Sequence, residues 1–288
     1  MATLIRAISE NGGIVVTALD STQIVNEMQI AHHTSPVCSA ALGRLLTGAC
    51  LMGANLKSTS DVLTLRIKAD GPAGQVVAIV NGKGNVKGYI ENPFVDMPLR
   101  SDNKLNVGGA VGKDGSLYVI KDMGLKEPYS GQVPLVSGEI AEDITSYYAI
   151  SEQTPNVCAL GVLVNTDLSI LNAGGYLLQL LPGATDEEIS QIETNLSKMK
   201  SVTELLQENK TPTEIAFMLL DGFNPNLLDE QNVEYKCDCC YDKMERAVIS
   251  LGRTELEKLR DEDDRLELCC QYCNKHYNLF ASEILKNL

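Results

Sequence analysis

Thiol side chains between positions 237 and 273 have the clearest capacity for chemistry in this sequence. Nine cysteines occur in the 288 residues, and six of them fall in that short stretch. They form two close-spaced groups, Cys237-Asp238-Cys239-Cys240 and Cys269-Cys270-Gln271-Tyr272-Cys273. Two close-spaced thiolate pairs are typical of a tetrahedral zinc site, whereas buried free cysteines do not usually cluster in this way. The spacing therefore predicts one bound zinc ion.

The residues alone leave the choice of the four zinc ligands open. One set is Cys237 and Cys239 with Cys270 and Cys273, and the other replaces Cys239 by Cys240 so that both pairs read Cys-x-x-Cys. His276 follows Cys273 by three positions and could replace one thiolate, but we interpret it as a solvent-exposed histidine.

Four thiolates favour a switch over a catalytic metal. A catalytic zinc keeps an open position for water, and four protein ligands close that shell. Thiolates are also the groups that oxidants attack, and a Cys-x-Cys pair in extended conformation has its Cα atoms about 6.5 Å apart, within reach of a disulfide. Oxidation would remove ligands, and loss of zinc would remove on the order of 10 kcal/mol of folding free energy. A purely structural zinc is the main alternative.

The elements that precede the cysteines predict an α+β protein in three parts. Residues 1–184 are expected to form a core domain of mixed sheet and helix, 185–235 an acidic helical linker, and 236–288 a zinc-binding redox-switch domain. In the core, Leu63 to Ala69 alternate as a strand buried on one face, and Ser35-Pro36 begins a helix rich in Ala, Leu and Gly. Further expected core elements are strands at 14–16, 75–80, 86–90 and 117–121, a helix at 137–152 and a hairpin of 158–164 with 168–173.

The linker is expected to consist of two or three short helices. Potential capping boxes occur at Thr185 with Glu188, at Ser201 with Glu204 and at Thr211 with Glu214. Between positions 186 and 234 there are eleven acidic residues and three lysines, a charge that weakens a compact state. After the linker, residues 244–260 show helical periodicity with Gly252 as a weak point.

Composition and charge exclude several functions. The net charge of −14 argues against binding to a nucleic-acid backbone, since that affinity comes mostly from Lys and Arg. We find no apolar run of membrane-spanning length and no signal peptide, and we expect a cytoplasmic protein with no membrane partner. The glycine-rich stretch 108–114 lacks the spacing of a phosphate loop and is interpreted as a turn. Cys38, Cys50, Cys158 and His32-His33 are interpreted as structural.

The sequence closely resembles the 33-kilodalton heat-shock chaperone family, the redox-regulated bacterial holdases. The resemblance covers nearly the whole chain and rests on Cys-x-Cys followed after some thirty residues by Cys-x-x-Cys, and on several stretches in the core. Those stretches are Asp70-Gly71-Pro72, Gly88-Tyr89, Tyr129-Ser130-Gly131, Tyr148 with Ser151-Glu152-Gln153, and the run Gly174 to Ala184. The resemblance selects Cys239 over Cys240, so it implies zinc bound by Cys237, Cys239, Cys270 and Cys273. Cys240 and Cys269 depart from the pattern and leave the pairing of sulfurs after oxidation open.

The resemblance implies a molecular chaperone without enzymatic activity. Oxidants would form the disulfides Cys237–Cys239 and Cys270–Cys273, release zinc, unfold the C-terminal domain and linker, and expose surfaces that hold unfolding client proteins without ATP. Active forms of the family are often homodimers. Apolar faces of the linker are candidate client surfaces or docked core: Ile189, Ile192, Leu196, Met199, Ile215, Phe217, Met218 and Leu219. The alternative from another class is a constitutive zinc-ribbon protein that binds nucleic acid or another partner; it lacks the basic stripe such binding needs.

Overall fold

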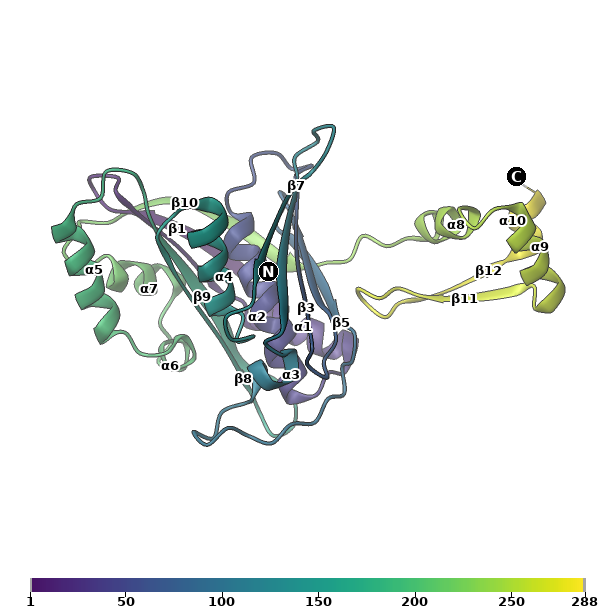
Figure 1. Ribbon diagram of the computed structural model, residues 1–288, viewed down its shortest axis with the longest axis horizontal. Coiled ribbons are helices and arrows are strands. Elements are labelled where there is room, and N and C mark those ends of the chain that lie inside the picture. The colour runs from purple at the N-terminus through teal and green to yellow at the C-terminus, as the bar shows by residue number, and fades with distance from the viewer. Residues whose placement is uncertain (1, 287–288) are drawn as a thin grey trace. The chain divides into compact units, whose positions relative to one another are not determined.

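The computed structural model describes residues 2–286 and divides into two compact units at the bond between Tyr235 and Lys236. Each unit is described by itself (Figure 1). Both contain helices and strands, so the predicted α+β class is confirmed.

A single mixed sheet is the framework of the first unit. Its strands are β1 (Ala2–Ile8), β2 (Ile14–Asp20), β3 (Val62–Ala69), β4 (Val76–Asn81), β5 (Asn85–Ile90), β6 (Gly115–Asp122), β7 (Tyr129–Pro134), β8 (Asn156–Val164), β9 (Ile170–Leu180) and β10 (Asn226–Tyr235). Their order across the sheet is β7-β6-β3-β4-β5-β10-β1-β2-β9-β8. Neighbours pair antiparallel except for β10 and β5, which are parallel over only two residues. The sheet therefore consists of two halves that β10 joins.

Helix α2 (Pro36–Gly53) is the centre of the core and packs against strands from both halves of the sheet. It begins after Ser35 with a proline in its first turn, as predicted, and its small residues allow close packing: a Cβ on Gly53 would lie 2.6 Å from Val80 Cγ1. Among the described residues, α2 alone is long and apolar enough to cross a membrane by length and composition. Of that stretch, 89% is buried inside the unit, as in the core helix of a folded domain.

The remaining helices of residues 2–184 refine the sequence predictions. They are α1 (Thr22–His32), which was not predicted, α3 (Val107–Val111), α4 (Ala141–Tyr147) and the π-helix η1 (Tyr148–Glu152). The helix expected from residue 137 begins four residues later because the Asp143 carboxylate accepts hydrogen bonds from the N–H groups of Val136, Ser137 and Ile140 and holds them in a turn. The stretch 108–114, interpreted as a turn, instead contains most of α3.

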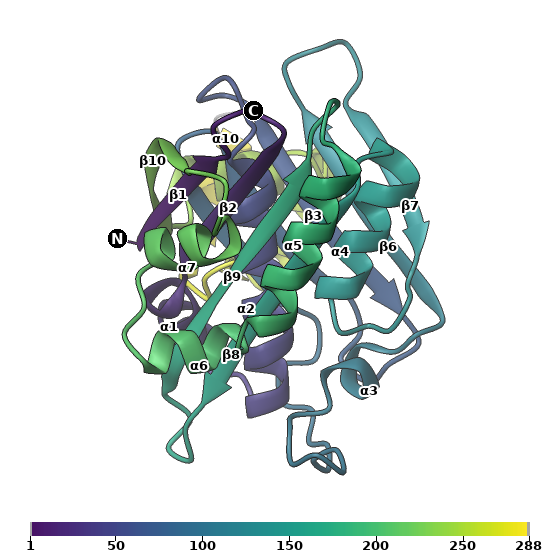
Figure 2. The ribbon, with the colours of Figure 1, turned by 90° about the vertical axis from the view of Figure 1, so that its left-hand side faces the viewer.

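Three short helices follow β9, each beginning at a predicted capping box. They are α5 (Asp186–Lys198), α6 (Val202–Gln207) and α7 (Pro212–Leu219). Helix α6 packs on β8 and β9, and α7 packs on β1 and β2 (Figure 2). Residues 226–235 of the predicted helical linker are not helical but form β10, because pairing with β1 more than two hundred residues away decides their conformation. The three-part domain division remains a prediction, while contacts group residues 185–235 with the sheet.

The second unit is small. It contains α8 (Tyr241–Ile249), α9 (Arg253–Glu262), the hairpin strands β11 (Arg265–Cys269) and β12 (His276–Phe280), and α10 (Ala281–Lys286). The helix predicted over 244–260 is two helices, separated where Gly252 adopts a φ of 85° that other residues rarely tolerate. Its buried core consists of Val248, Leu256, Cys270, Tyr277, Leu279 and Ile284. So small a core provides little stability by itself.

Candidate metal centre

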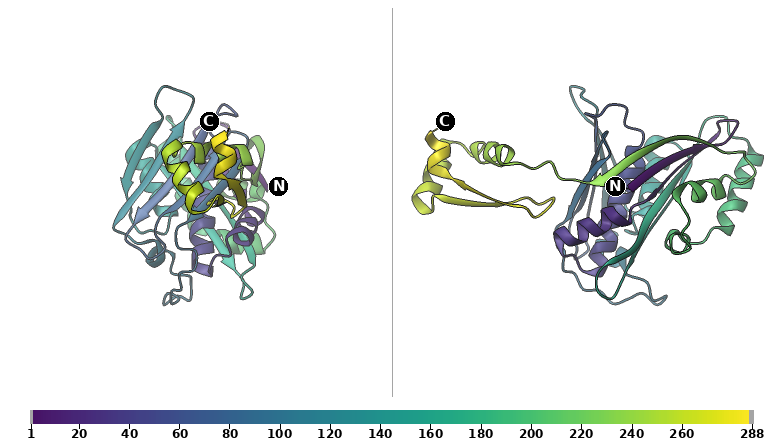
Figure 3. Two further views of the ribbon diagram at one scale, coloured as in Figure 1. Left: turned by 90° about the vertical axis from the view of Figure 1, so that its right-hand side faces the viewer. Right: turned by 180° about the vertical axis from the view of Figure 1, so that it is seen from behind.

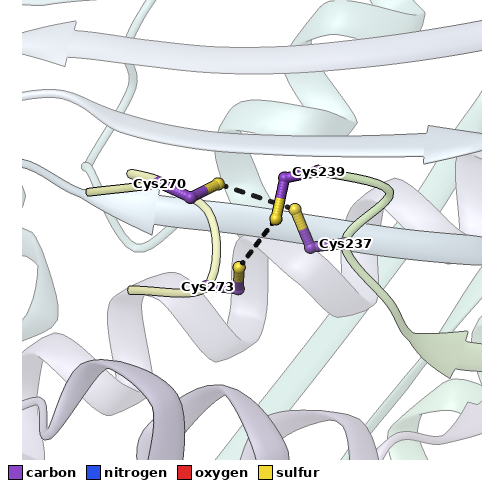
Figure 4. Close-up of side chains that lie close together, drawn as sticks. All are labelled: Cys237, Cys239, Cys270 and Cys273. Atoms are coloured by element: carbon purple, nitrogen blue, oxygen red, sulfur yellow. Dashed lines mark hydrogen bonds between the residues drawn. The ribbon is translucent and has the colours of Figure 1, made fainter. Parts of the chain in front are cut away.

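A hairpin loop and an extended segment bring four thiols together. Cys237 and Cys239 lie in the irregular segment that follows β10. Cys270 and Cys273 lie in the loop between β11 and β12, where the Asn274 N–H donates to the Cys270 carbonyl at 2.8 Å and the Cys270 N–H donates to Lys275 at 3.0 Å. These bonds fold the loop tightly, so that both thiols point toward the extended segment (Figure 4).

The four sulfur atoms lie at the separations that a tetrahedral metal site requires. The Sγ atoms of Cys237, Cys239, Cys270 and Cys273 are all within 4.8 Å of one another. Cys237 Sγ lies 3.7 Å from Cys270 Sγ, and Cys239 Sγ lies 3.4 Å from Cys273 Sγ (Figure 4). Zinc–sulfur bonds of about 2.3 Å would place the sulfurs of a tetrahedron about 3.8 Å apart. This donor set therefore fits one soft divalent metal ion.

The neighbouring candidates lie outside this group. Cys240 is exposed at the start of α8, and Cys269 is exposed at the end of β11. The Sγ atom of Cys269 lies 3.9 Å from Nε2 of His276, which is exposed as predicted. The four thiols that lie together are thus those of the Cys-x-Cys and Cys-x-x-Cys pairs. The alternative ligand set, with Cys240 in place of Cys239, does not form such a group.

Burial and hydrogen bonds shift the pKa values of three of the four thiols, and not all in the same direction. Burial, together with hydrogen bonds with the thiols of Cys239 and Cys270, raises the pKa of Cys237 to about 11. Burial also raises the pKa of Cys273. At Cys239, burial again acts upward, but hydrogen bonds from Tyr277 and from the neighbouring thiols outweigh it, and its pKa lies below the ordinary value. Of these three thiols, Cys239 therefore most readily carries negative charge.

Tyr277 is a part of the site that the sequence interpretation missed. Its hydroxyl donates to Cys239 Sγ at 3.1 Å, while its ring is buried in the core of the second unit and contacted by the Lys275 ammonium, 5.5 Å from the ring centre. The alternation of Leu266 and Leu268 with polar residues, and of Tyr277 with Leu279, could have indicated the hairpin. Nothing in the sequence indicates the hydroxyl–sulfur contact.

The three scattered cysteines are buried, as predicted. Cys38, Cys50 and Cys158 lie in the core of the first unit. Burial raises the pKa of both Cys50 and Cys158 to about 12, so these thiols stay protonated and unreactive at neutral pH. All nine cysteines are free thiols.

An α+β unit followed by a small unit with four gathered thiols defines a protein with a site that could hold a metal ion. Comparison with known proteins gives the family. The Hsp33 protein family model matches residues 2–280. The 33 kDa chaperonin of Clostridium perfringens (strain SM101 / Type A) is 48% identical over 287 residues, which cover 99% of this chain and 90% of that protein. The 33 kDa chaperonin of Clostridioides difficile (strain 630) is 44% identical over 285 residues, covering 99% and 98%.

A solved structure agrees over the same length. The crystal structure of the 33 kDa chaperonin (heat shock protein 33 homolog) from Thermotoga maritima matches with a TM-score of 0.92 at 34% identity, covering 99% of this chain and 98% of that chain. The chain therefore belongs to the Hsp33 family. The names of these relatives describe chaperonins.

Proposed function

We propose that this protein is a redox-regulated, ATP-independent holdase that reduced, zinc-bound cysteines keep inactive. The observation that carries the proposal is the group of four thiols within 4.8 Å of one another, in a unit with a small apolar core of its own. Membership in the Hsp33 family supports the chaperone assignment. The protein's partners are then unfolding polypeptides, with a homodimer as a possible active form and the cytoplasm as the site of action.

Zinc is the metal that this donor set suits best, and Cys237, Cys239, Cys270 and Cys273 are the proposed ligands. Bound zinc would supply a cross-link between the segment after β10 and the β11–β12 loop. Thiolate ligands favour zinc over magnesium or calcium, which prefer oxygen. The hydroxyl of Tyr277 supports this arrangement because it donates to Cys239 and so stabilises the thiolate form.

Oxidation would convert the site in two equivalent steps. In each step two thiolates give two electrons to peroxide, which takes up two protons and leaves as two water molecules while a sulfur–sulfur bond forms. The proposed bonds are Cys237–Cys239 and Cys270–Cys273. Each bond removes two of the metal's four ligands, and the second unit then loses the cross-link that its small core requires.

The linker, residues 185–235, is the proposed element that transmits this change. Its candidate client residues fall into two groups. Phe217 and Met218 are exposed and line a groove of about 500 Å³ beside Met199, whereas Ile192, Ile215 and Leu219 are buried against the sheet. Loss of the linker's packing would therefore enlarge the apolar surface that α7 already presents. Such a surface suits the apolar side chains of an unfolding protein.

One experiment tests the proposal. Zinc release is followed with a chromogenic chelator during peroxide treatment, while light scattering reports the aggregation of a thermally unfolding client. We expect zinc release to accompany suppression of aggregation, and reduced protein to suppress it weakly. Equal suppression before and after oxidation would exclude the switch. Binding of DNA or RNA in a filter assay at low salt would instead favour the zinc-ribbon alternative.

A further inference from the structure

Strand β10 is held in the sheet mainly through its backbone. It pairs antiparallel with β1, with partners Ala2↔Val233, Thr3↔Asn232, Leu4↔Gln231, Ile5↔Glu230, Arg6↔Asp229, Ala7↔Leu227 and Ile8↔Asn226. Yet the side chains of its first five residues are all exposed, and Val233 is its only buried residue, at 2% exposure. Main-chain hydrogen bonds are independent of sequence. The position of β10 is therefore one that many different sequences could occupy.

Strand β1 has what it needs to remain folded without β10. On its other edge it pairs with β2 from Leu4 to Ile8. Its side chains Leu4, Ile5 and Ala7 are buried at 2% exposure or less. Helix α2 packs on strands of both halves of the sheet and would keep them together. If β10 left the sheet, β1 would thus stay in place but have one edge with unpaired N–H and C=O groups. Such an edge can pair with another strand.

The far end of β10 pairs with β5 over two residues only and lies next to the thiols in the sequence. The pairs are Glu234↔Asn85 and Tyr235↔Val86, with the Glu234 N–H donating to the Gly84 carbonyl at 3.0 Å. The Tyr235 hydroxyl contacts His32 and Gly88 and restrains this end. Only Lys236 separates Tyr235 from Cys237, so unfolding of the second unit would act on β10 at this end first.

We propose that β10 is a releasable strand and that the edge of β1 it vacates accepts an extended segment of an unfolding polypeptide as a replacement strand. Figure 3 shows β10 (light green) beside β1 (dark purple). This inference rests on the proposed function, and it names a binding surface separate from the apolar faces of α5 and α7. A backbone-recognising edge suits clients of arbitrary sequence, because it requires only an extended chain with free N–H and C=O groups.

Two contacts restrict which side chains the replacement strand can have. Opposite Ala2, where Val233 is buried, it needs a small apolar side chain. Opposite Arg6, whose Nε lies 3.4 Å from the Asp229 carboxylate, an acidic or polar residue fits better than a basic one. The other positions from 226 to 232 are exposed or half-buried and place little restriction on the sequence, whereas Tyr235 is half-buried and packs against the core.

The pairing geometry provides a matched pair of probes. The Glu234 N–H points to the β5 side, and successive N–H groups along a strand point to opposite edges, so the N–H groups of Val233, Gln231 and Asp229 point toward β1. The probe is a fluorescein-labelled peptide with the sequence of residues 226–235. One variant is N-methylated at Gln231 and Asp229, and its control is N-methylated at Asn232 and Glu230.

Fluorescence anisotropy with the full-length protein tests the proposal. We expect the unmodified peptide to bind oxidised protein at least tenfold more tightly than reduced, zinc-loaded protein, and to restore aggregation of a bound client when added in excess. Methylation of the β1-facing amides should reduce affinity at least tenfold, while the control peptide should bind almost as well as the unmodified one.

Several results would overturn it. The first is equal binding to reduced and oxidised protein, and the second is equal loss of affinity in both methylated peptides. In the third, the oxidised protein is a dimer, and the peptide converts it to monomer without displacing the client. That result would mean that β10 of a second copy occupies the vacated edge of β1. If oxidised protein holds clients but does not bind the peptide, only this inference fails; if oxidation produces no holding activity, the proposed function fails.

Discussion

The Nε2 atom of His32 lies 3.0 Å from the hydroxyl of Tyr235, joining the end of α1 to the last residue of β10. His32 is buried, and the same hydroxyl lies 3.5 Å from the Gly88 carbonyl oxygen on β5. A side chain two residues before Cys237 is therefore fixed to two other elements of the first unit. This contact opposes the release of β10, so its strength is expected to set how easily the proposed switch operates.

Replacing Tyr235 by Phe is expected to make activation easier. The variant loses a hydrogen bond worth about 1 kcal/mol but keeps the aromatic ring. At equal peroxide, holding activity measured by light scattering should appear severalfold faster than in the wild type, with zinc content in the reduced state unchanged. Tyr118→Phe, which removes a hydroxyl on β6 of the same sheet, is the control and should behave as wild type. Unchanged activation kinetics in Tyr235→Phe would show that the contact does not restrain β10.

Replacing Cys270 by Ser is expected to remove most of the bound zinc. Serine is a poor zinc ligand, and three thiolates leave the metal's shell incomplete. Zinc content of the purified reduced protein provides the measurement. Cys269→Ser and Cys240→Ser are matched controls, since each removes an exposed thiol next to a proposed ligand, and both should retain the metal. Normal zinc content in Cys270→Ser with loss in Cys269→Ser would move the ligand to Cys269.

Acidification is expected to weaken metal binding steeply. In the metal-free protein the pKa of Cys237 is about 11 and that of Cys273 is also raised, so both thiols are protonated at neutral pH and must lose their protons when metal binds. Releasing at least these two protons lowers the binding constant by about 100-fold or more for each pH unit of acidification. Competition with a chelator of known proton affinity, at pH 8 and pH 7, measures the change. A pH-independent binding constant would contradict the protonated state of these thiols.

Replacing Tyr277 by Phe is expected to reduce the reactivity of Cys239. The lost hydroxyl no longer stabilises the thiolate, so the pKa of Cys239 rises and the thiolate fraction at a given pH falls. In metal-free reduced protein, alkylation of Cys239 by iodoacetamide, followed by peptide mass spectrometry, should be slower and its pH profile shifted upward. Alkylation of Cys240 in the same samples is the internal control. An unshifted profile at Cys239 would show that another group stabilises its thiolate.

Removal of zinc by a chelator under reducing conditions is expected to unfold the second unit and leave the centre of the first unit folded. Hydrogen exchange should become fast at the amides of α8, α9 and the β11–β12 hairpin, while β2 to β4 and α2 stay protected. The contrast follows from the two cores, one built around a long buried helix and the other from six buried residues. Equal protection of the hairpin with and without metal would leave the proposed mechanism without its first step.

The parts of the fold that local chemistry determines could be predicted from the sequence. The capping boxes at Thr185, Ser201 and Thr211 correctly located three helix starts because each needs only residues three positions apart. The strand around Leu63 to Ala69 was found from its alternation. Strand β10 was missed because its partner lies on β1, at the opposite end of the chain, and its exposed side chains show no pattern of burial.

For the candidate site, the sequence indicated the region of the thiols but not their arrangement. Cysteine spacing identified the region where the structure gathers four thiols, and the resemblance selected Cys239, which lies with Cys237, Cys270 and Cys273. That these four residues bind zinc stays a prediction. Spacing alone could not distinguish Cys239 from Cys240, because that choice depends on where α8 begins: Cys240 is its N-cap residue and remains exposed. The proximity of His32 to Tyr235 depends on the packing of α1 beside β10 and has no sequence signal.

The four thiols come in two pairs from separate segments, and this has a consequence for how the centre would respond over time. Under the proposed function, oxidation of either pair would be enough to release the ion, whereas rebuilding the centre would require both pairs to be reduced at once. The rate of metal loss would thus be set by the pair that is oxidised sooner, and the rate of metal rebinding by the pair that is reduced later. The proposed switch would therefore turn on quickly under oxidation and turn off slowly after reduction.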